Sequence, residues 1–173
     1  MTDVPWATTS RLVLRSPRPE DVDRLFAIHS NVLTYEHNPD GRMVDPEDAQ
    51  RLLEAWRSHW VAHGFGYAAV ELAGSREIIG FAGAKHQTIG GQPVLNLYYR
   101  FDPSSWGHGY ASEAVRAVIA NVQSTVPRCA VVARVAQNNP GSIAVARSVG
   151  LSRQLVTDPG DPSPHHLFAS QHL

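Results

Sequence analysis

The sequence of 173 residues contains one cysteine and no long apolar stretch. A single thiol, Cys129, cannot close an internal disulfide, which favours a reducing compartment. A membrane-spanning helix needs about 18 or more consecutive apolar residues, and no window of the sequence approaches that length. Residues 1–10 carry an acid and lack an apolar core, so they do not resemble a secretory signal. We therefore expect a cytoplasmic protein without a membrane partner.

An excess of charge of either sign is missing as well. The sequence has 15 Lys and Arg residues against 16 Asp and Glu, a net charge of −1, which gives no electrostatic reason to expect a nucleic-acid partner. Hydrophobic residues make up 43% and charged residues 18%, which excludes a disordered chain. Because a domain usually has about 100–200 residues, we expect residues 1–173 to form one domain. We expect the protein to be a monomer or a homodimer.

Hydrophobic periodicity and the positions of glycine and proline predict a mixed α/β fold. Strands are expected over residues 11–15, 67–72, 78–85, 94–101, 129–135, 151–156 and 165–169. Helices are expected over residues 19–29, 46–60, 111–122 and 140–149. Asp45 and Asn139 occupy N-cap positions, each directly before a proline that suits the first helical position.

The loop before the helix at 111–122 contains Gly107 and Gly109. Without Cβ atoms, these residues let a ligand approach the backbone, and the helix N-terminus adds unpaired N–H groups. Such a concavity suits a pyrophosphate, although a glycine pair before a helix is by itself more often a tight turn. Ser112 stands where a dinucleotide-binding fingerprint needs its third glycine, and the Gly-Lys-Ser/Thr of a P-loop is missing.

Two longer motifs carry a family resemblance. Residues 101–114, with the pattern Trp-Gly-x-Gly-Tyr-Ala-x-Glu-Ala, resemble motif A of the GNAT acetyltransferases, in the form typical of the ribosomal-protein N-terminal acetyltransferases of the RimJ and RimL type. Residues 133–151 resemble motif B of the same branch, and residues 9–21 resemble its first strand and helix. The resemblance implies a mostly antiparallel mixed sheet of about seven strands with four helices, splayed between the strands at 94–101 and 129–135.

The resemblance also implies an activity and a cofactor site. It implies transfer of an acetyl group from acetyl-CoA to a primary amine, by direct attack in a ternary complex. The expected acceptor is the α-amine of a protein or peptide N-terminus, and a backbone N–H near Phe101 would polarise the thioester carbonyl. The residues expected to bind acetyl-CoA are Tyr99, Arg100, Phe101, Trp106, Gly107, His108, Gly109, Tyr110, Ala111, Ser112, Asn139 and Ser142.

The acid and base that the family often uses are replaced here. In the family, the strand that corresponds to residues 94–101 often carries a glutamate that acts as the general base, and this sequence has Asn96 there. The family's motif B often has a tyrosine that protonates the leaving thiolate, but no tyrosine follows Tyr110 in this sequence. The candidates that remain are catalytic Glu36 and His86 for proton transfer and Ser142 as the thiolate's proton donor. We expect Tyr35, His37 and Asn96 to contact the acceptor.

Several alternatives remain open from the sequence. The acceptor could be a small molecule such as an amino acid, a polyamine or an antibiotic, or the protein could be a catalytically weak CoA-binding sensor. His86 could be a partly buried structural histidine, and the segment around Glu36 and His37 could be a solvated loop. We expect no metal site, since strand alternation sends His165 and His166 to opposite faces and His172 adds no acid or thiol.

Overall fold

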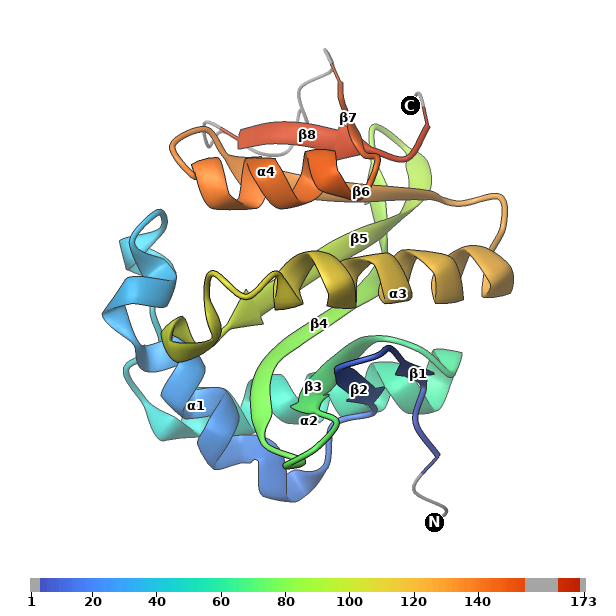
Figure 1. Cartoon of the computed structure of the whole chain (residues 1–173). Helices are drawn as coiled ribbons and strands as arrows, with labels where there is room; N and C mark the ends of the chain where they lie inside the picture. The colour runs from blue at the N-terminus through green and yellow to red at the C-terminus, as the bar shows by residue number, and fades with distance from the viewer. Residues whose placement is uncertain (1–3, 155–164, 172–173) are drawn as a thin grey trace.

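The computed structural model describes residues 4–154 and 165–171 (Figure 1). Within this part, an eight-stranded sheet has the order β1-β2-β3-β4-β5-β6-β8-β7, and only β5 and β6 pair in parallel. The strands are β1 (Ala7–Thr8), β2 (Leu12–Arg15), β3 (Tyr67–Leu72), β4 (Ile78–Ile89), β5 (Gln92–Phe101), β6 (Ala130–Ala136), β7 (Ser152–Arg153) and β8 (His165–Ala169).

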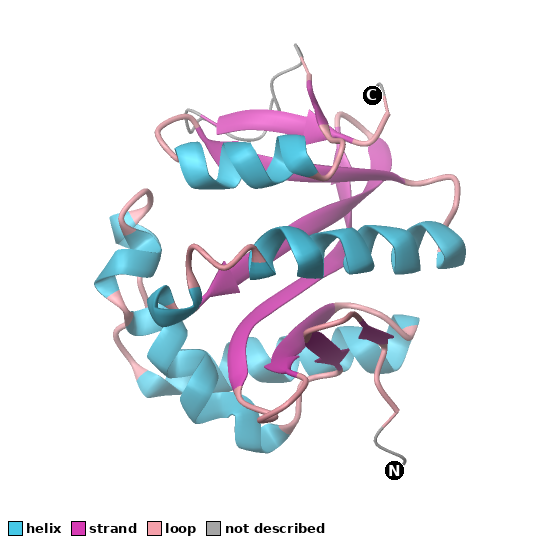
Figure 2. Cartoon of the chain, in the orientation of Figure 1, coloured by secondary structure: helices cyan, strands magenta, loops and turns pink. Residues whose placement is uncertain are grey.

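Four α-helices pack on the two faces of this sheet (Figure 2). They are α1 (Val22–Ser30), α2 (Pro46–His63), α3 (Tyr110–Thr125) and α4 (Pro140–Ser148), with short 3₁₀ helices η1 (Pro19–Asp21), η2 (Val32–Tyr35), η3 (Pro39–Gly41) and η4 (Pro103–Ser105). On one face, α1 and α2 bury a cluster that includes Leu25, Trp56 and Phe81. On the other, apolar residues of α3 and α4 join the larger core cluster. The mixed α/β fold class with four helices is confirmed.

The structure departs from the sequence prediction at the ends of elements. The helix expected from residue 19 begins as η1, where the Asp21 carboxylate accepts a hydrogen bond from the Arg18 N–H and closes a tighter turn. β4 runs on to Ile89, because it stays paired with β5 up to the turn at Gly90 and Gly91. The sequence also gave no sign of β1. The last two residues of the strand expected at 151–156, and His172, lie outside the described residues.

The pairing of β5 with β6 is short, and it positions the site. Only three pairs form, from Val94 opposite Ala130 to Asn96 opposite Val132. Beyond them, β5 stays paired with β4 as far as Phe101, and β6 stays paired with β8 as far as Ala136. The two strands therefore separate, as the family resemblance implied, and the facing edge of each is left without a ladder partner.

A buried ion cluster ties β2 to the start of α1 and to β3. The Arg15 guanidinium donates two parallel hydrogen bonds to Asp21, at 2.8 and 2.9 Å, and a third to Glu71. All three side chains are buried. Such forked pairs are geometrically specific, and a single missing partner leaves a buried charge uncompensated. The cluster thus sets the direction in which α1 leaves the sheet.

Replacing Arg15 by methionine should therefore strongly destabilise the fold. We expect Arg15→Met to lower the free energy of unfolding by about 3–5 kcal/mol, because the buried Asp21 carboxylate loses its cation and the buried Glu71 carboxylate keeps only Arg76. Arg51, whose partners Glu47 and Asp48 lie on the exposed side of α2, provides the matched control. Arg51→Met should have a much smaller effect, because water screens this exposed ion pair. Urea unfolding of both variants measures the difference, and equal losses would contradict the assigned role of the Arg15 cluster.

Candidate active site

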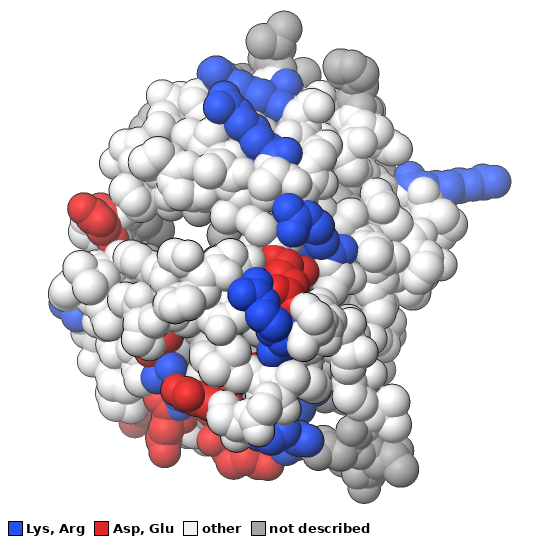
Figure 3. Space-filling view, viewed as in Figure 1, with Lys and Arg blue, Asp and Glu red and all other residues white. Residues whose placement is uncertain are grey.

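A cavity opens where β5 and β6 separate. Its volume is about 530 Å³, within the range of roughly 300–1,000 Å³ usual for small-ligand sites. The wall combines β5, β6, the loop before α3, the first turns of α3 and α4, and the η2 segment. Figure 3 shows an opening to the left of centre, between the surface over α4 and that over the loop before α3. The wall thus contains residues whose side chains lie on both faces of β5, such as Tyr99 on one and Arg100 on the other.

The loop before α3 presents its backbone to this cavity. Gly107 and Gly109 have φ values of 78° and 77°, in the left-handed region that favours glycine. A Cβ built at Gly107 meets nothing within 4 Å, so the space beside the loop is open. Gly109 is the N-cap of α3 and offers no side-chain oxygen, and the first N–H groups of a helix have no partner within it. This is the arrangement that binds an anion at a helix N-terminus.

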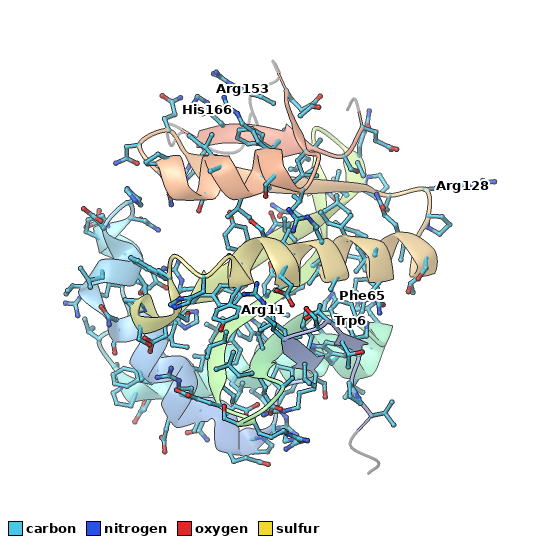
Figure 4. All side chains as sticks on the ribbon, in the orientation of Figure 1. Trp6, Arg11, Phe65, Arg128, Arg153 and His166 are labelled. Carbon is cyan, nitrogen blue, oxygen red and sulfur yellow. The ribbon has the colours of Figure 1, made fainter. Side chains whose placement is uncertain are left out.

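Side chains behind the loop hold it in place. The carboxylate of Glu113, in the first turn of α3, accepts hydrogen bonds from the Thr9 hydroxyl at 2.5 Å and from the Arg11 Nε at 2.7 Å. Arg11 also donates to the His108 carbonyl and lies over the Tyr110 ring (Figure 4). Burial would raise the pKa of Glu113, but these hydrogen bonds and the Arg11 charge lower it overall. Glu113 therefore stays ionised and fixes the loop from the side away from the cavity.

Helix α4 contributes a capped N-terminus on the opposite side of the cavity. The Asn139 side-chain oxygen accepts a hydrogen bond from the Ser142 N–H at 2.9 Å, which makes Asn139 the N-cap. The Tyr99 hydroxyl, from β5, donates to the Ser142 carbonyl at 3.2 Å and so links α4 to β5 across the separation. Burial raises the pKa of Tyr99 to about 12, so this phenol remains a neutral donor.

The other side of the cavity is formed by η2 and by alternate residues of β5. Tyr99 and Phe101 pack into the core cluster that contains the apolar residues of α3. Strand alternation turns Tyr98 and Arg100 to the opposite face, where the Arg100 guanidinium lies 3.7 Å from the Tyr35 ring centroid and donates to the Thr34 carbonyl. The two faces of β5 therefore serve two different compartments.

A buried hydrogen-bonded chain lies behind this second compartment. The His29 Nδ1–H donates to the Leu25 carbonyl at 2.9 Å, which leaves Nε2 as the acceptor for the Tyr98 hydroxyl at 2.7 Å. Burial, together with the Arg100 charge, lowers the pKa of His29 to about 4. Burial also raises the pKa of Tyr98. Both groups are neutral at pH 7, so they orient side chains without adding charge.

Most residues expected at the site lie in the cavity wall. These are Glu36, His37, Tyr99, Arg100, Phe101, Trp106, Gly107, Gly109, Tyr110, Ala111, Ser112, Asn139 and Ser142. The structure thus brings the three separate segments of the expected site together around one space. It also adds wall residues that sequence reasoning did not single out for the site, among them Leu33, Tyr98 and Arg134.

Tyr35, His86, Asn96 and His108 are not in that wall. Asn96 donates to the Tyr67 hydroxyl at 3.0 Å, and His108 bonds with the Ser105 carbonyl through Nδ1 and stacks on Tyr110. Tyr35 is buried beneath Arg100.

His86 belongs to a separate aromatic cluster. Its ring lies 4.9 Å from that of His63, 5.2 Å from that of Phe65 and 6.2 Å from that of His59. The backbone pairs with Leu95, before β5 and β6 separate. Burial lowers the pKa values of His59 and His86, which favours the neutral form of these two rings.

The described residues hold neither a cluster of metal ligands nor a membrane-spanning helix. They contain no group of three His, Cys, Asp or Glu side chains that could hold a metal ion. Among the same residues, no helix is both long and apolar enough to cross a membrane.

Comparison with known proteins shows several relatives. The chain is 27% identical over 146 residues to the uncharacterized protein YkkB of Bacillus subtilis (strain 168), which covers 83% of each chain. It superposes on the acetyltransferase from Agrobacterium tumefaciens str. C58 with a TM-score of 0.81 at 22% identity, covering 98% of this chain and 95% of that one. It superposes on RimL, a ribosomal L7/L12 alpha-N-protein acetyltransferase solved with coenzyme A, with a TM-score of 0.75 at 16% identity, covering 96% and 97%.

The sequence also matches the model of a protein family. Residues 11–152 match the acetyltransferase (GNAT) domain, and this range contains the glycine loop, both separated strands and the capped α4. The chain therefore belongs to the GNAT acetyltransferase family, and it is an acetyl-CoA-dependent N-acetyltransferase.

Proposed function

We propose that this enzyme acetylates α-amines, with the N-terminus of a protein or peptide as acceptor, in the manner of the RimJ and RimL branch that its motif A resembles. The observation that carries the proposal is the cavity where β5 and β6 separate, whose wall contains side chains from both faces of β5. One face offers an anion-binding loop and the other a separate compartment, so acetyl donor and amine can be held at once. The fold likeness to RimL, an alpha-N-protein acetyltransferase, supports this acceptor class.

The residues of the first compartment fit acetyl-CoA. The open space beside Gly107 is the cradle that a pyrophosphate requires, and the N–H groups of residues 107–112 are its donors. The free edge of β5, at residues 99–101, offers backbone groups to the pantetheine arm. Ser142 and Asn139 line the cavity from α4, beside the thiol end. When bound, acetyl-CoA supplies the thioester carbonyl that the amine attacks.

The chain's own part in the reaction is to position the two substrates and to polarise the thioester carbonyl. A backbone N–H near Phe101 on the free edge of β5 stabilises negative charge on the carbonyl oxygen. Holding the amine against the carbonyl contributes much of the rate, because two bound reactants no longer have to meet in solution. Ser142, one of several hydroxyl-bearing residues in the cavity wall, is the proposed proton donor to the departing sulfur.

The scarcity of bases in the cavity favours an α-amine over a lysine side chain. Glu36 is the single carboxylate among the described residues of the wall, and Asn96 is turned towards Tyr67. At pH 7, removing the proton from an α-amine with a pKa near 8 costs about 1.4 kcal/mol, against about 4.6 kcal/mol for a lysine with a pKa near 10.4. The difference of about 3 kcal/mol is what a well-placed base supplies. Without a second carboxylate, the α-amine is the easier substrate.

Gly109→Val should abolish acetyl-CoA binding. The new side chain contacts the Arg11 guanidinium, whose Nη2 lies 3.8 Å from a Cβ built at Gly109, and the positive φ adds strain. Both effects shift the loop that presents the N–H donors. Gly150→Val is the matched control, since Gly150 has a φ of 84° and lies outside the cavity wall. A Cβ built at Gly150 meets nothing within 4 Å, whereas one built at Gly109 meets only the Arg11 Nη2, at an ordinary contact distance. Saturating acetyl-CoA should raise the melting temperature of wild type and Gly150→Val but leave Gly109→Val unchanged. Equal ligand shifts in the two variants would remove the loop from the site.

Asn139→Ala should weaken both the fold and the use of acetyl-CoA. Losing an N-cap costs about 1 kcal/mol of stability, and the loosened first turn of α4 also lines the cavity. Asp45→Ala removes the equivalent cap of α2, whose side chain accepts from the Glu47 N–H away from the cavity. We expect similar losses in urea unfolding but a raised KM for acetyl-CoA in Asn139→Ala alone. A normal KM would leave Asn139 as a structural cap.

The acceptor class is tested with two matched peptides. One has a free N-terminus and an acetylated lysine, and the other has a blocked N-terminus and a free lysine. Product formation is followed from pH 6 to 9 by release of free thiol from acetyl-CoA. We expect the α-amine peptide to react faster at pH 7, and the gap to narrow as the pH rises and the lysine loses its proton. A preference for the lysine peptide at pH 7 would refute the proposal.

A further inference from the structure

Arg100 is a cation without a counter-ion in the second compartment, and this inference about it rests on the proposed function. Its backbone lies on the free edge of β5, but its side chain points to the face opposite Tyr99 and Phe101. The guanidinium therefore lies on the acceptor side of the sheet and not beside the pyrophosphate loop. A charged group there acts on whatever approaches the thioester from that side.

The donors of Arg100 are only partly used. One Nη1 hydrogen bond goes to the Thr34 carbonyl, and the flat face of the guanidinium stacks on the Tyr35 ring. The Nε–H is buried and has no acceptor within the described residues. Among those residues, Arg100 forms no ion pair with an Asp or Glu, although Glu36 lies in the same wall. A guanidinium has five donors, so several remain for a ligand.

The surroundings hold this cation in place without neutralising it. Tyr35 supports it from one side, and the Tyr98–His29 chain packs behind it with both groups neutral. A partly buried cation and an unpaired buried N–H are both unfavourable unless something compensates them. The buried Arg15, by contrast, is compensated internally by Asp21 and Glu71. The contrast indicates that the partner of Arg100 arrives with the substrate.

We propose that Arg100 binds a carboxylate carried by the acceptor, so that the substrates are primary amines with a nearby carboxylate. Two sources share this chemistry: the α-carboxylate of a free amino acid, and an acidic side chain close to the N-terminus of a peptide. Polyamines and aminoglycosides, which bring further positive charge, are poor partners for a compartment that contains an uncompensated guanidinium. A planar guanidinium binds a carboxylate through two parallel hydrogen bonds, which would also orient the amine.

The test measures binding first, independently of turnover. Calorimetry on the protein saturated with CoA compares Ala-Asp-Ala-amide with Ala-Asn-Ala-amide for the peptide source, and alanine with alaninamide for the amino-acid source. In at least one pair we expect the carboxylate to bind about tenfold more tightly or better, as charge-assisted hydrogen bonds do. The pair that shows the preference identifies the source. Equal affinity within both pairs, or tighter binding of spermidine than of either carboxylate, would overturn the proposal.

Variants assign the preference to Arg100. Arg100→Gln should reduce the carboxylate preference to less than about twofold, and Arg100→Lys should keep part of it because the charge remains without the forked geometry. Arg128→Gln is the control, since that side chain is exposed and projects away from the cavity (Figure 4). The CoA affinity of every variant is measured too. A preference that survives Arg100→Gln in a variant with wild-type CoA affinity would overturn the assignment, as would loss of the preference in Arg128→Gln.

Turnover separates this inference from the proposed function. N-acetylated product is measured by mass spectrometry for the same four compounds with acetyl-CoA. Product formed equally from acid and isostere would refute the role of Arg100 and leave the α-amine acetyltransferase intact. Selective, Arg100-dependent binding of carboxylates without any product would support the carboxylate site while refuting the proposed function.

Discussion

The site depends on the point at which two neighbouring strands stop pairing. A strand inside a sheet normally forms backbone hydrogen bonds with a neighbouring strand on each side. A strand edge without such a neighbour can form backbone hydrogen bonds with another chain or a ligand. β5 keeps its full ladder to β4, and β6 keeps its ladder to β8, but the two share only three pairs. The free edges face each other across the cavity, where a strand-like ligand can bind them. Helices α3 and α4 both begin at this opening. The backbone N–H groups at the start of α3 and the Asn139 cap of α4 therefore lie around the same cavity.

Strand alternation then divides the work of β5 between two compartments. Odd-numbered residues such as Tyr99 and Phe101 support the side shared with α3 and α4, and even-numbered residues such as Tyr98 and Arg100 form the side shared with η2. Because successive side chains of a strand point to opposite faces, donor and acceptor sites are separated by only one residue of sequence. In the proposed function, the reaction takes place across this strand, between the two compartments.

Charge is distributed unevenly around these compartments. Arg11 is compensated by Glu113 behind the glycine loop, and Arg15 is compensated by two carboxylates beneath α1. Arg100 instead lies over the Tyr35 ring, which in turn contacts the His29 ring. Burial, together with the Arg100 charge, lowers the pKa of His29 to about 4. Keeping His29 neutral avoids a second positive charge beside Arg100, and it lets Tyr98 donate in one fixed direction. The structural ion pairs are thus separate from Arg100, the cation that we propose binds the acceptor.

The sequence by itself determined the four helices, most strands and the glycine loop, because periodicity, caps and turn residues are local signals. The two motifs also indicated the separated strands and most of the residues that now lie in the cavity wall. Local signals could not place side chains that depend on long-range packing. Only the tertiary structure shows that Asn96 bonds to Tyr67. It also brings the His86 ring next to those of His59 and His63. In the same way, it places Thr9 and Arg11 against Glu113, which lies more than 100 residues away in the sequence. The same applies to Arg100. Strand alternation in the sequence already separates its side chain from those of Tyr99 and Phe101. The packing of η2 over β5, which gives Arg100 the Thr34 carbonyl and the Tyr35 ring as partners in place of a carboxylate, is seen only in the structure.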